Sequence, residues 1–168
     1  MMPTASALWG NRLIEVKKNS VSMATFVYNG DGQRVKSVMT TNLGSTTTYF
    51  AGAHYEVVEG YTGTQVNKYY YAGSQRIAMR SNGTLYFMLG DHLGSTSLIT
   101  FANGNVVSET RYKAWGETRY ASGTSPTNYT FTGQYSYTGL TRNCRDLATY
   151  GIGRKQAIAV QVQVDTLE

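Results

Sequence analysis

The chain has 168 residues, enough for one domain with a hydrophobic core, and its 14 Tyr and 18 Gly against only 2 Pro favour pleated strands and glycine turns over helices. The formal net charge of +5 permits contact with an acidic partner, but Lys and Arg are scattered singly, which argues against a nucleic-acid-binding stripe. The single Cys144 excludes an intramolecular disulfide framework, and neither a membrane span nor an export signal is expected from the apolar pattern. Localisation is left open.

Apolar and aromatic residues alternate or form short blocks, which turn residues interrupt at intervals of about eight to twelve residues. We expect residues 1–23 to supply an N-terminal lead-in strand and residues 24–136 to form a domain of β-hairpins. The predicted strands are 25–28, 34–39, 46–50, 54–59, 68–71, 76–80, 97–101 and 106–112. The predicted fold class is therefore all-β, an antiparallel meander of repeated β-hairpins.

Residues 137–168 differ from the rest of the chain. The alternation of residues 157–164 predicts a strand, whereas residues 147–151 fit a short helix or a loop equally well. This divergent C-terminal tail is either a capping strand that covers an open sheet edge or an altered ending, such as a reading-frame change would produce.

The hairpins repeat in sequence. Residues 26–35 run from an aromatic residue through a tyrosine, a polar glycine turn and an arginine to a β-branched residue, and residues 68–77 repeat this order loosely. More specific motifs follow, namely DHLGS at 91–95, NGNVV at 103–107, YKAWGE at 112–117 and YTFTGQ at 129–134. Together these segments resemble the tyrosine–aspartate (YD) repeat family, specifically the RHS (rearrangement hot spot) repeat-associated core region, over about residues 24 to 136.

The resemblance implies a strip of hairpins that curls into a sheet or partial barrel and that spirals into a hollow shell in long family members. Such shells enclose the toxic C-terminal domain of bacterial polymorphic toxins, and related shells occur in teneurin-type cell-surface proteins, so the family is often secreted or cell-surface. Tyr28-Asn29 stands where the family has Tyr-Asp, and the chain has no Asp-Pro dipeptide. Self-cleavage by the family mechanism is therefore not supported.

Candidate catalytic residues are few. Asp91, His92 and the neighbouring Ser95 suggest an acid, base and nucleophile, but three residues of one turn do not normally place a base between its two partners. We therefore favour a structural role in which Asp91 accepts N–H groups of its turn. Glu109 and Glu117 flank the Trp115 turn and are the best carboxylate pair for a small hydrolase of the glycosidase or esterase type. A metal site at His54, His92 and Glu56 or Asp91 lacks paired-ligand spacing, so we expect neither metal nor cofactor.

The aromatic residues suggest binding. Tyr86, Tyr112, Trp115 and Tyr120 could form a platform on which a saccharide ring stacks, although we favour core packing and cross-strand pairing as the role of these residues. The leading hypothesis is a non-enzymatic structural module, a truncated segment of an RHS-type shell that binds saccharide or self-associates; the small hydrolase is the alternative. Because open sheet edges need partners, we expect a homo-oligomer formed through those edges.

Overall fold

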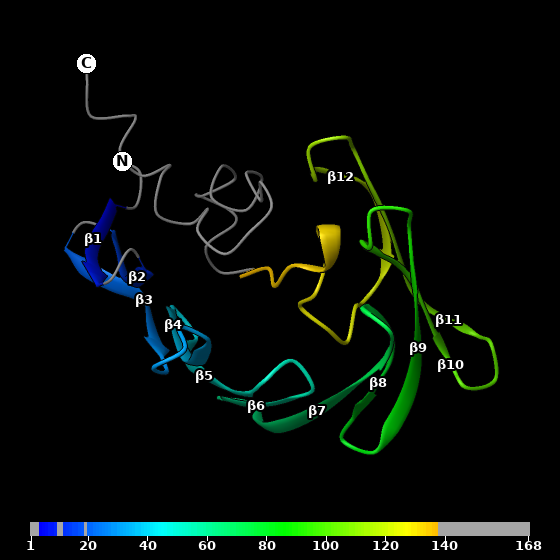
Figure 1. The fold of residues 1–168 in the computed structure, drawn as a ribbon, viewed down its shortest axis with the longest axis horizontal. Coiled ribbons are helices and arrows are strands. Elements are labelled where there is room, and N and C mark those ends of the chain that lie inside the picture. The colour runs from blue at the N-terminus through cyan, green and yellow to red at the C-terminus, as the bar shows by residue number, and fades with distance from the viewer. Residues whose placement is uncertain (1–3, 10–11, 19, 138–168) are drawn as a thin grey trace. The chain divides into compact units, whose positions relative to one another are not determined.

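The computed structural model describes residues 4–9, 12–18 and 20–137, so the predicted capping strand at 157–164 lies outside the described residues. Each strand is hydrogen-bonded to its neighbours in the chain, and the order of strands in the sheet is therefore the order of the sequence, β1 to β12 (Figure 1). The twelve strands and one short 3-10 turn are β1 Thr4–Trp9, β2 Arg12–Lys18, β3 Val21–Tyr28, β4 Arg34–Thr41, β5 Gly44–Ala51, β6 Tyr55–Gly60, β7 Gly63–Ala72, β8 Gln75–Ser81, β9 Thr84–Gly90, β10 Thr96–Phe101, β11 Val106–Tyr112, β12 Thr118–Gly123 and η1 Phe131–Gly133. The predicted all-β antiparallel meander is confirmed. No helix among these residues has the length and apolar character to span a membrane.

The described residues fall into two compact units, the first built from residues up to Gly52 together with Val58–Thr64. Ala24 and Phe26 on β3 are buried two residues apart, as the alternation of a half-buried strand requires. Leu13 and Val16 on β2 are also buried but lie three residues apart, and the β1–β2 register shifts between them. Residues 1–23, from which we expected one lead-in strand, contain β1, β2 and the start of β3. The chain reverses just before β3, where Ser20 adopts a left-handed φ of 66°.

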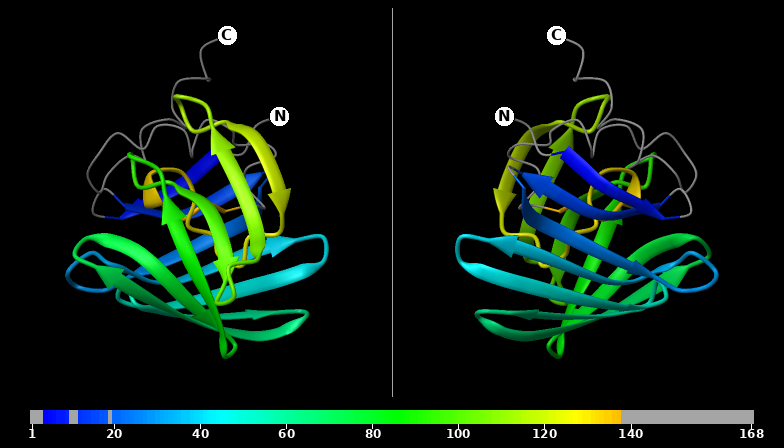
Figure 2. Two further views of the ribbon diagram at one scale, coloured as in Figure 1. Left: turned by 90° about the vertical axis from the view of Figure 1, so that its right-hand side faces the viewer. Right: turned by 90° about the vertical axis from the view of Figure 1, so that its left-hand side faces the viewer.

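The second unit comprises Ala53–Val57 and Gln65–Tyr137. Tyr69, Met79 and Met88 form its buried core cluster. Tyr70 and Phe87 point to the opposite face, where they are 42% and 43% exposed. Figure 2 shows the long hairpins of this unit from two sides. A strand with one buried and one solvent-exposed face alternates apolar and polar residues, which is why this alternation predicted strands in the sequence.

A tyrosine near the end of every fourth strand makes the same kind of hydrogen bond to a backbone carbonyl. Tyr28 on β3 donates its hydroxyl to the Leu13 carbonyl at 3.0 Å. Tyr71 on β7 donates in the same way to the Ala53 carbonyl at 3.1 Å, and Tyr112 on β11 to the Thr96 carbonyl at 3.2 Å. The strand register shifts directly before each of these tyrosines. We call these three hydrogen bonds the tyrosine braces; they show that β3, β7 and β11 are equivalent positions of one four-strand repeat.

An arginine follows two of these tyrosines in the next strand. The Arg34 guanidinium on β4 lies 5.9 Å from the Phe26 ring centroid, and Arg76 on β8 lies 5.0 Å from that of Tyr69. Cations at this distance are attracted by the ring face, so the arginine and aromatic residues read in the repeated sequence pattern meet in space.

Candidate functional site

The turn at residues 91–95 is shaped by Asp91. One carboxylate oxygen, Oδ1, accepts the backbone N–H groups of Leu93 and Ser95, both at 2.9 Å. Partial burial of Asp91 opposes its ionisation, but the hydrogen bonds from Ser95 and Leu93 and the nearby His92 lower the pKa of the carboxyl below its ordinary value. The carboxylate therefore performs the turn-capping role that we favoured from the sequence.

Ser95 is not placed as a nucleophile. Its side chain is fully buried, and its Oγ accepts the backbone N–H of Thr132 at 3.0 Å. His92 is exposed at the surface of the same turn. A serine that is inaccessible and already used as an acceptor cannot readily attack a substrate, so the arrangement of this turn suits architecture rather than acyl transfer.

Glu109 and Glu117 each face a cation of their own. Arg111 Nε donates to Glu109 at 2.7 Å, and Lys113 Nζ donates to Glu117 at 2.7 Å. Glu117 lies opposite Lys113 across the hairpin turn, and Lys113 is four residues along the strand from Glu109, roughly 13 Å at the usual rise per residue. Paired glycosidase carboxylates lie about 5 to 10 Å apart. The structure thus pairs each carboxylate with a different cation and does not pair the two carboxylates with a common partner.

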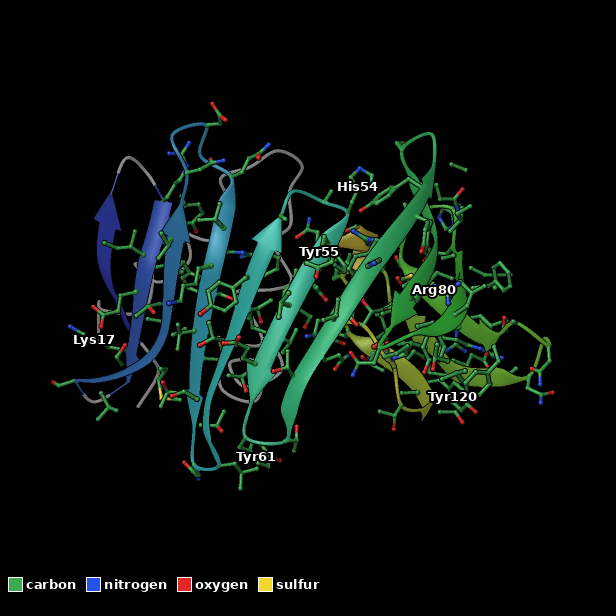
Figure 3. All side chains as sticks on the ribbon, turned by 90° about the horizontal axis from the view of Figure 1, so that it is seen from below. Lys17, His54, Tyr55, Tyr61, Arg80 and Tyr120 are labelled. Carbon is green, nitrogen blue, oxygen red and sulfur yellow. The ribbon has the colours of Figure 1, made fainter. Side chains whose placement is uncertain are left out.

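The four aromatic candidates divide into two pairs. Trp115, in the turn between β11 and β12, is 75% exposed, and Tyr120 on β12 is 47% exposed. Tyr120 is labelled in Figure 3. Tyr86 is half-buried against Phe101, with ring centroids 5.5 Å apart, and Tyr112 packs against Phe131 at 5.6 Å. Burial raises the pKa of Tyr112 to about 12, with a further contribution from the charge of Asp91. Trp115 and Tyr120 are the most exposed of the four, although the Arg111 guanidinium lies 5.3 Å from the Tyr120 ring centroid.

Glu56 is a buried residue whose role the sequence did not reveal. It is 1% exposed, and its Oε1 accepts hydrogen bonds from Asn67 Nδ2 at 2.8 Å and from the Tyr69 hydroxyl at 2.6 Å. Tyr69 also bonds Thr127, so the carboxylate joins the sheet to the segment after β12. Burial, and then the charge of Glu56, raise the pKa of Tyr69 far above its ordinary value. Glu56 is buried and Glu59 is exposed, as strand alternation requires of two residues three apart on β6, but alternation gives no sign of this network.

His54 and Glu56 do not converge on a metal position. His54 lies in the turn before β6 and contacts the Tyr71 ring edge-on at 4.8 Å between centroids, whereas Glu56 points into the network just described. In the part of the chain that the structure describes, no three His, Cys, Asp or Glu side chains gather in a way that could hold a metal ion.

The segment 124–137, which we call the strap, packs on the sheet of the second unit. Thr96 N–H donates to the Thr130 carbonyl at 3.1 Å, and the Arg76 guanidinium lies 3.5 Å from the Tyr129 ring centroid. Burial raises the pKa of Tyr129 to about 12, the Glu56 charge adds to this shift, and Arg76 opposes it. The motif YTFTGQ signalled a turn here, but not that its backbone would be held by strand ends more than thirty residues earlier.

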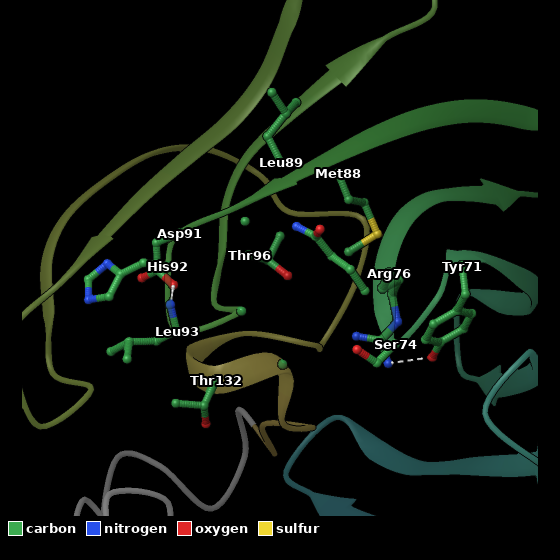
Figure 4. Close-up of a pocket in the computed structure, with 14 residues that line it drawn as sticks. Tyr71, Ser74, Arg76, Met88, Leu89, Asp91, His92, Leu93, Thr96 and Thr132 are labelled. Atoms are coloured by element: carbon green, nitrogen blue, oxygen red, sulfur yellow. Dashed lines mark hydrogen bonds between the residues drawn. The ribbon is translucent and has the colours of Figure 1, made fainter.

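A cavity of about 630 Å³ lies between the strap and the ends of strands β7 to β10. Figure 4 shows Arg76, Ser74 and Tyr71 on one side of it and Asp91, His92 and Leu93 on the other. Thr96 and Thr132 line the space between them. Its volume falls within the range of ligand sites in proteins.

No protein-family model and no curated protein sequence is similar to the chain. Solved structures do share its architecture. A chain of the crystal structure of TcdB2-TccC3-TEV matches with a TM-score of 0.63 at 15% identity, over 79% of this chain and 8% of that chain. A chain of the crystal structure of TcdB2-TccC3 gives 0.61 at 16% identity, over 76% and 8%. The Photorhabdus luminescens Tc holotoxin pore with a TccC3 mutation gives 0.62 at 16% identity, over 76% and 7%.

The likeness is one of fold. This chain spans 8% or less of the length of these solved chains, and fewer than one residue in five is identical in each match. The chain thus has the β fold of a part of these Tc toxin chains. Its activity and partners do not follow from that match.

Proposed function

We propose that the chain is a non-catalytic segment of an RHS/YD-type repeat shell. The tyrosine braces carry this proposal, because one interaction recurs at equivalent positions of β3, β7 and β11, as in an array built from identical structural units. The fold shared with Tc toxin chains supports it. The resemblance of residues 24–136 to the RHS repeat-associated core region supplies the family name.

Self-association through sheet edges is part of this proposal. β12 stands at one end of the strand order, and all six of its residues are exposed. A strand with only one neighbour leaves backbone N–H and C=O groups that another strand can pair. The partner is a second copy of this chain, or the tail from residue 137 onward acting as the predicted capping strand.

Saccharide binding is a second part of the proposal. Of the four aromatic residues considered from the sequence, we assign this role to Trp115 and Tyr120. Both residues are exposed in one hairpin, and planar aromatic faces stack on the apolar faces of sugars. Tyr86 and Tyr112 contribute through packing in this proposal, since Phe101 and Phe131 cover them in part.

Turnover measurements test the non-catalytic role against the hydrolase alternative. On chromogenic glycosides and esters we expect the purified chain to show the same background rate as its Glu117→Gln and His92→Ala variants. A rate that is abolished by either substitution, in a variant that keeps the wild-type circular dichroism spectrum, would contradict the proposal and establish a hydrolase.

A further inference from the structure

Arg76 is a partly buried cation that forms no ion pair with a carboxylate in the part of the chain that the structure describes. None of the ion pairs in the described part of the chain involves it, and its Nε is buried without a hydrogen-bond partner. Its Nη2 donates to the Tyr71 hydroxyl at 2.9 Å, which leaves further N–H groups of the guanidinium available. The rings of Tyr69, Tyr71 and Tyr129, whose centroids lie 5.0, 5.3 and 3.5 Å from the guanidinium, offset part of the cost of taking this charge out of water. A carboxylate at the remaining N–H groups would offset more of that cost, so the site favours an anion.

The position of Arg76 gives that anion a place to bind. Arg76 lines the 630 Å³ cavity together with Ser74, Gln75 and Thr96. Ser74 and Gln75 are exposed, so the cavity opens to solvent. A guanidinium presents several N–H groups in one plane, a geometry that matches the two oxygens of a carboxylate.

The remaining lining suits hydroxyl groups. Side chains that donate or accept hydrogen bonds surround the space, and Asp91 and His92 stand on the side opposite Arg76 (Figure 4). Asp91 would repel a second carboxylate, but its oxygens accept well from sugar hydroxyls. Leu89 and Leu93 add apolar surface of the kind that covers sugar C–H groups.

We propose that this cavity binds an acidic saccharide, a uronate residue whose carboxylate pairs with Arg76 and whose hydroxyls face Thr96, Asp91 and His92. The formal net charge of +5 raises the local concentration of such an anion. This site lies apart from the Trp115 platform and does not depend on the shell role.

Isothermal titration of the full chain with sodium glucuronate tests the site. We expect saturable binding that weakens as salt increases, and Arg76→Gln should weaken it at least about tenfold. Arg34→Gln is the matched control, because Arg34 has the equivalent place in the repeat but does not line the cavity, and it should bind as the wild type does. Thr96→Val removes one lining hydroxyl at nearly constant shape and should weaken binding several-fold, which keeps the test decisive if Arg76→Gln does not fold.

Three outcomes would overturn the proposal. The first is no saturable binding of glucuronate, or equal binding by the folded Arg76→Gln or Thr96→Val variant. The second is acetate binding as tightly as glucuronate, which would leave a simple carboxylate site, or glucose doing so, which would remove the role of the charge. The third is binding that is lost in Trp115→Ala and kept in Arg76→Gln, which would place the saccharide on the platform instead.

Discussion

Glu56 shows how a single buried polar residue links distant parts of the second unit. Its Oε1 accepts from Asn67 and Tyr69, while its buried Oε2 has no hydrogen-bond partner. Strand alternation accounts for the face that this side chain occupies, because alternation depends on the backbone alone. It could not predict the partners, since they come from the next strand and, through Tyr69, from Thr127 in the strap.

Removing the Glu56 carboxylate should destabilise the fold. We expect Glu56→Ala to lower the free energy of unfolding by about 2–4 kcal/mol, because Asn67 Nδ2 and the Tyr69 hydroxyl lose their common acceptor inside the protein. Glu56→Gln keeps one acceptor oxygen and should lower the free energy of unfolding by less than Glu56→Ala does. Urea unfolding of both variants checks this, and equal losses would show that the acceptor is not what matters.

Asp91 should make the free energy of unfolding depend on pH under acidic conditions. Because its pKa is lowered in the folded protein, its contribution is present above the unfolded value of about 3.9 and is lost as the pH falls through the folded pKa. We therefore expect Asp91→Asn to be less stable than wild type at neutral pH, with the difference disappearing below about pH 4. Urea midpoints measured across this range test it. Asp31→Asn, in the exposed β3–β4 turn, is the control and should show a smaller effect.

The elements were largely predictable where alternation and glycine turns coincide. Strands β3 to β8, β10 and β11 overlap the predicted ranges, because most of them alternate buried and exposed residues between glycine turns. β3 and β7 begin four and five residues earlier than predicted. β12 has no buried residue and therefore carries no alternation to detect. The strap was equally hidden, since its packing depends on backbone contacts to distant strand ends that no local pattern encodes.

The strap should become less stable when the side-chain oxygen that accepts its Thr132 N–H is removed. Ser95→Ala leaves the Thr132 N–H without the Ser95 Oγ, and we expect a loss of about 1–2 kcal/mol together with faster hydrogen exchange at Thr132. Ser122→Ala, on exposed β12, should change neither quantity. Unchanged exchange at Thr132 in Ser95→Ala would show that other contacts fix the strap.

At the scale of the whole molecule, a meander in sequence order leaves β1 and β12 at the two ends of the strand order. The sequence predicted this topology through its short turns, because hairpins join strands that are adjacent in space. It could not specify what pairs with the outer strands, since backbone groups on an edge are available to any strand.

Self-association should follow from the open edge. In sedimentation velocity runs we expect the average mass of the chain to rise with concentration. Ala121→Pro on β12 should reduce this rise, because proline lacks an N–H and is tolerated poorly where strands pair. A wild-type chain that stays monomeric at every concentration would contradict edge-to-edge pairing.

The repeat architecture is tested most directly by the free energy of unfolding of Tyr28→Phe, Tyr71→Phe and Tyr112→Phe. Each substitution keeps the ring and removes one tyrosine brace, so we predict a loss of about 1 kcal/mol for each, largest for Tyr71, whose hydroxyl also accepts from Arg76. Tyr70→Phe, on the exposed face, should be neutral. Losses confined to one of the three hairpins, or absent from all of them, would contradict a structural module built from equivalent four-strand repeats.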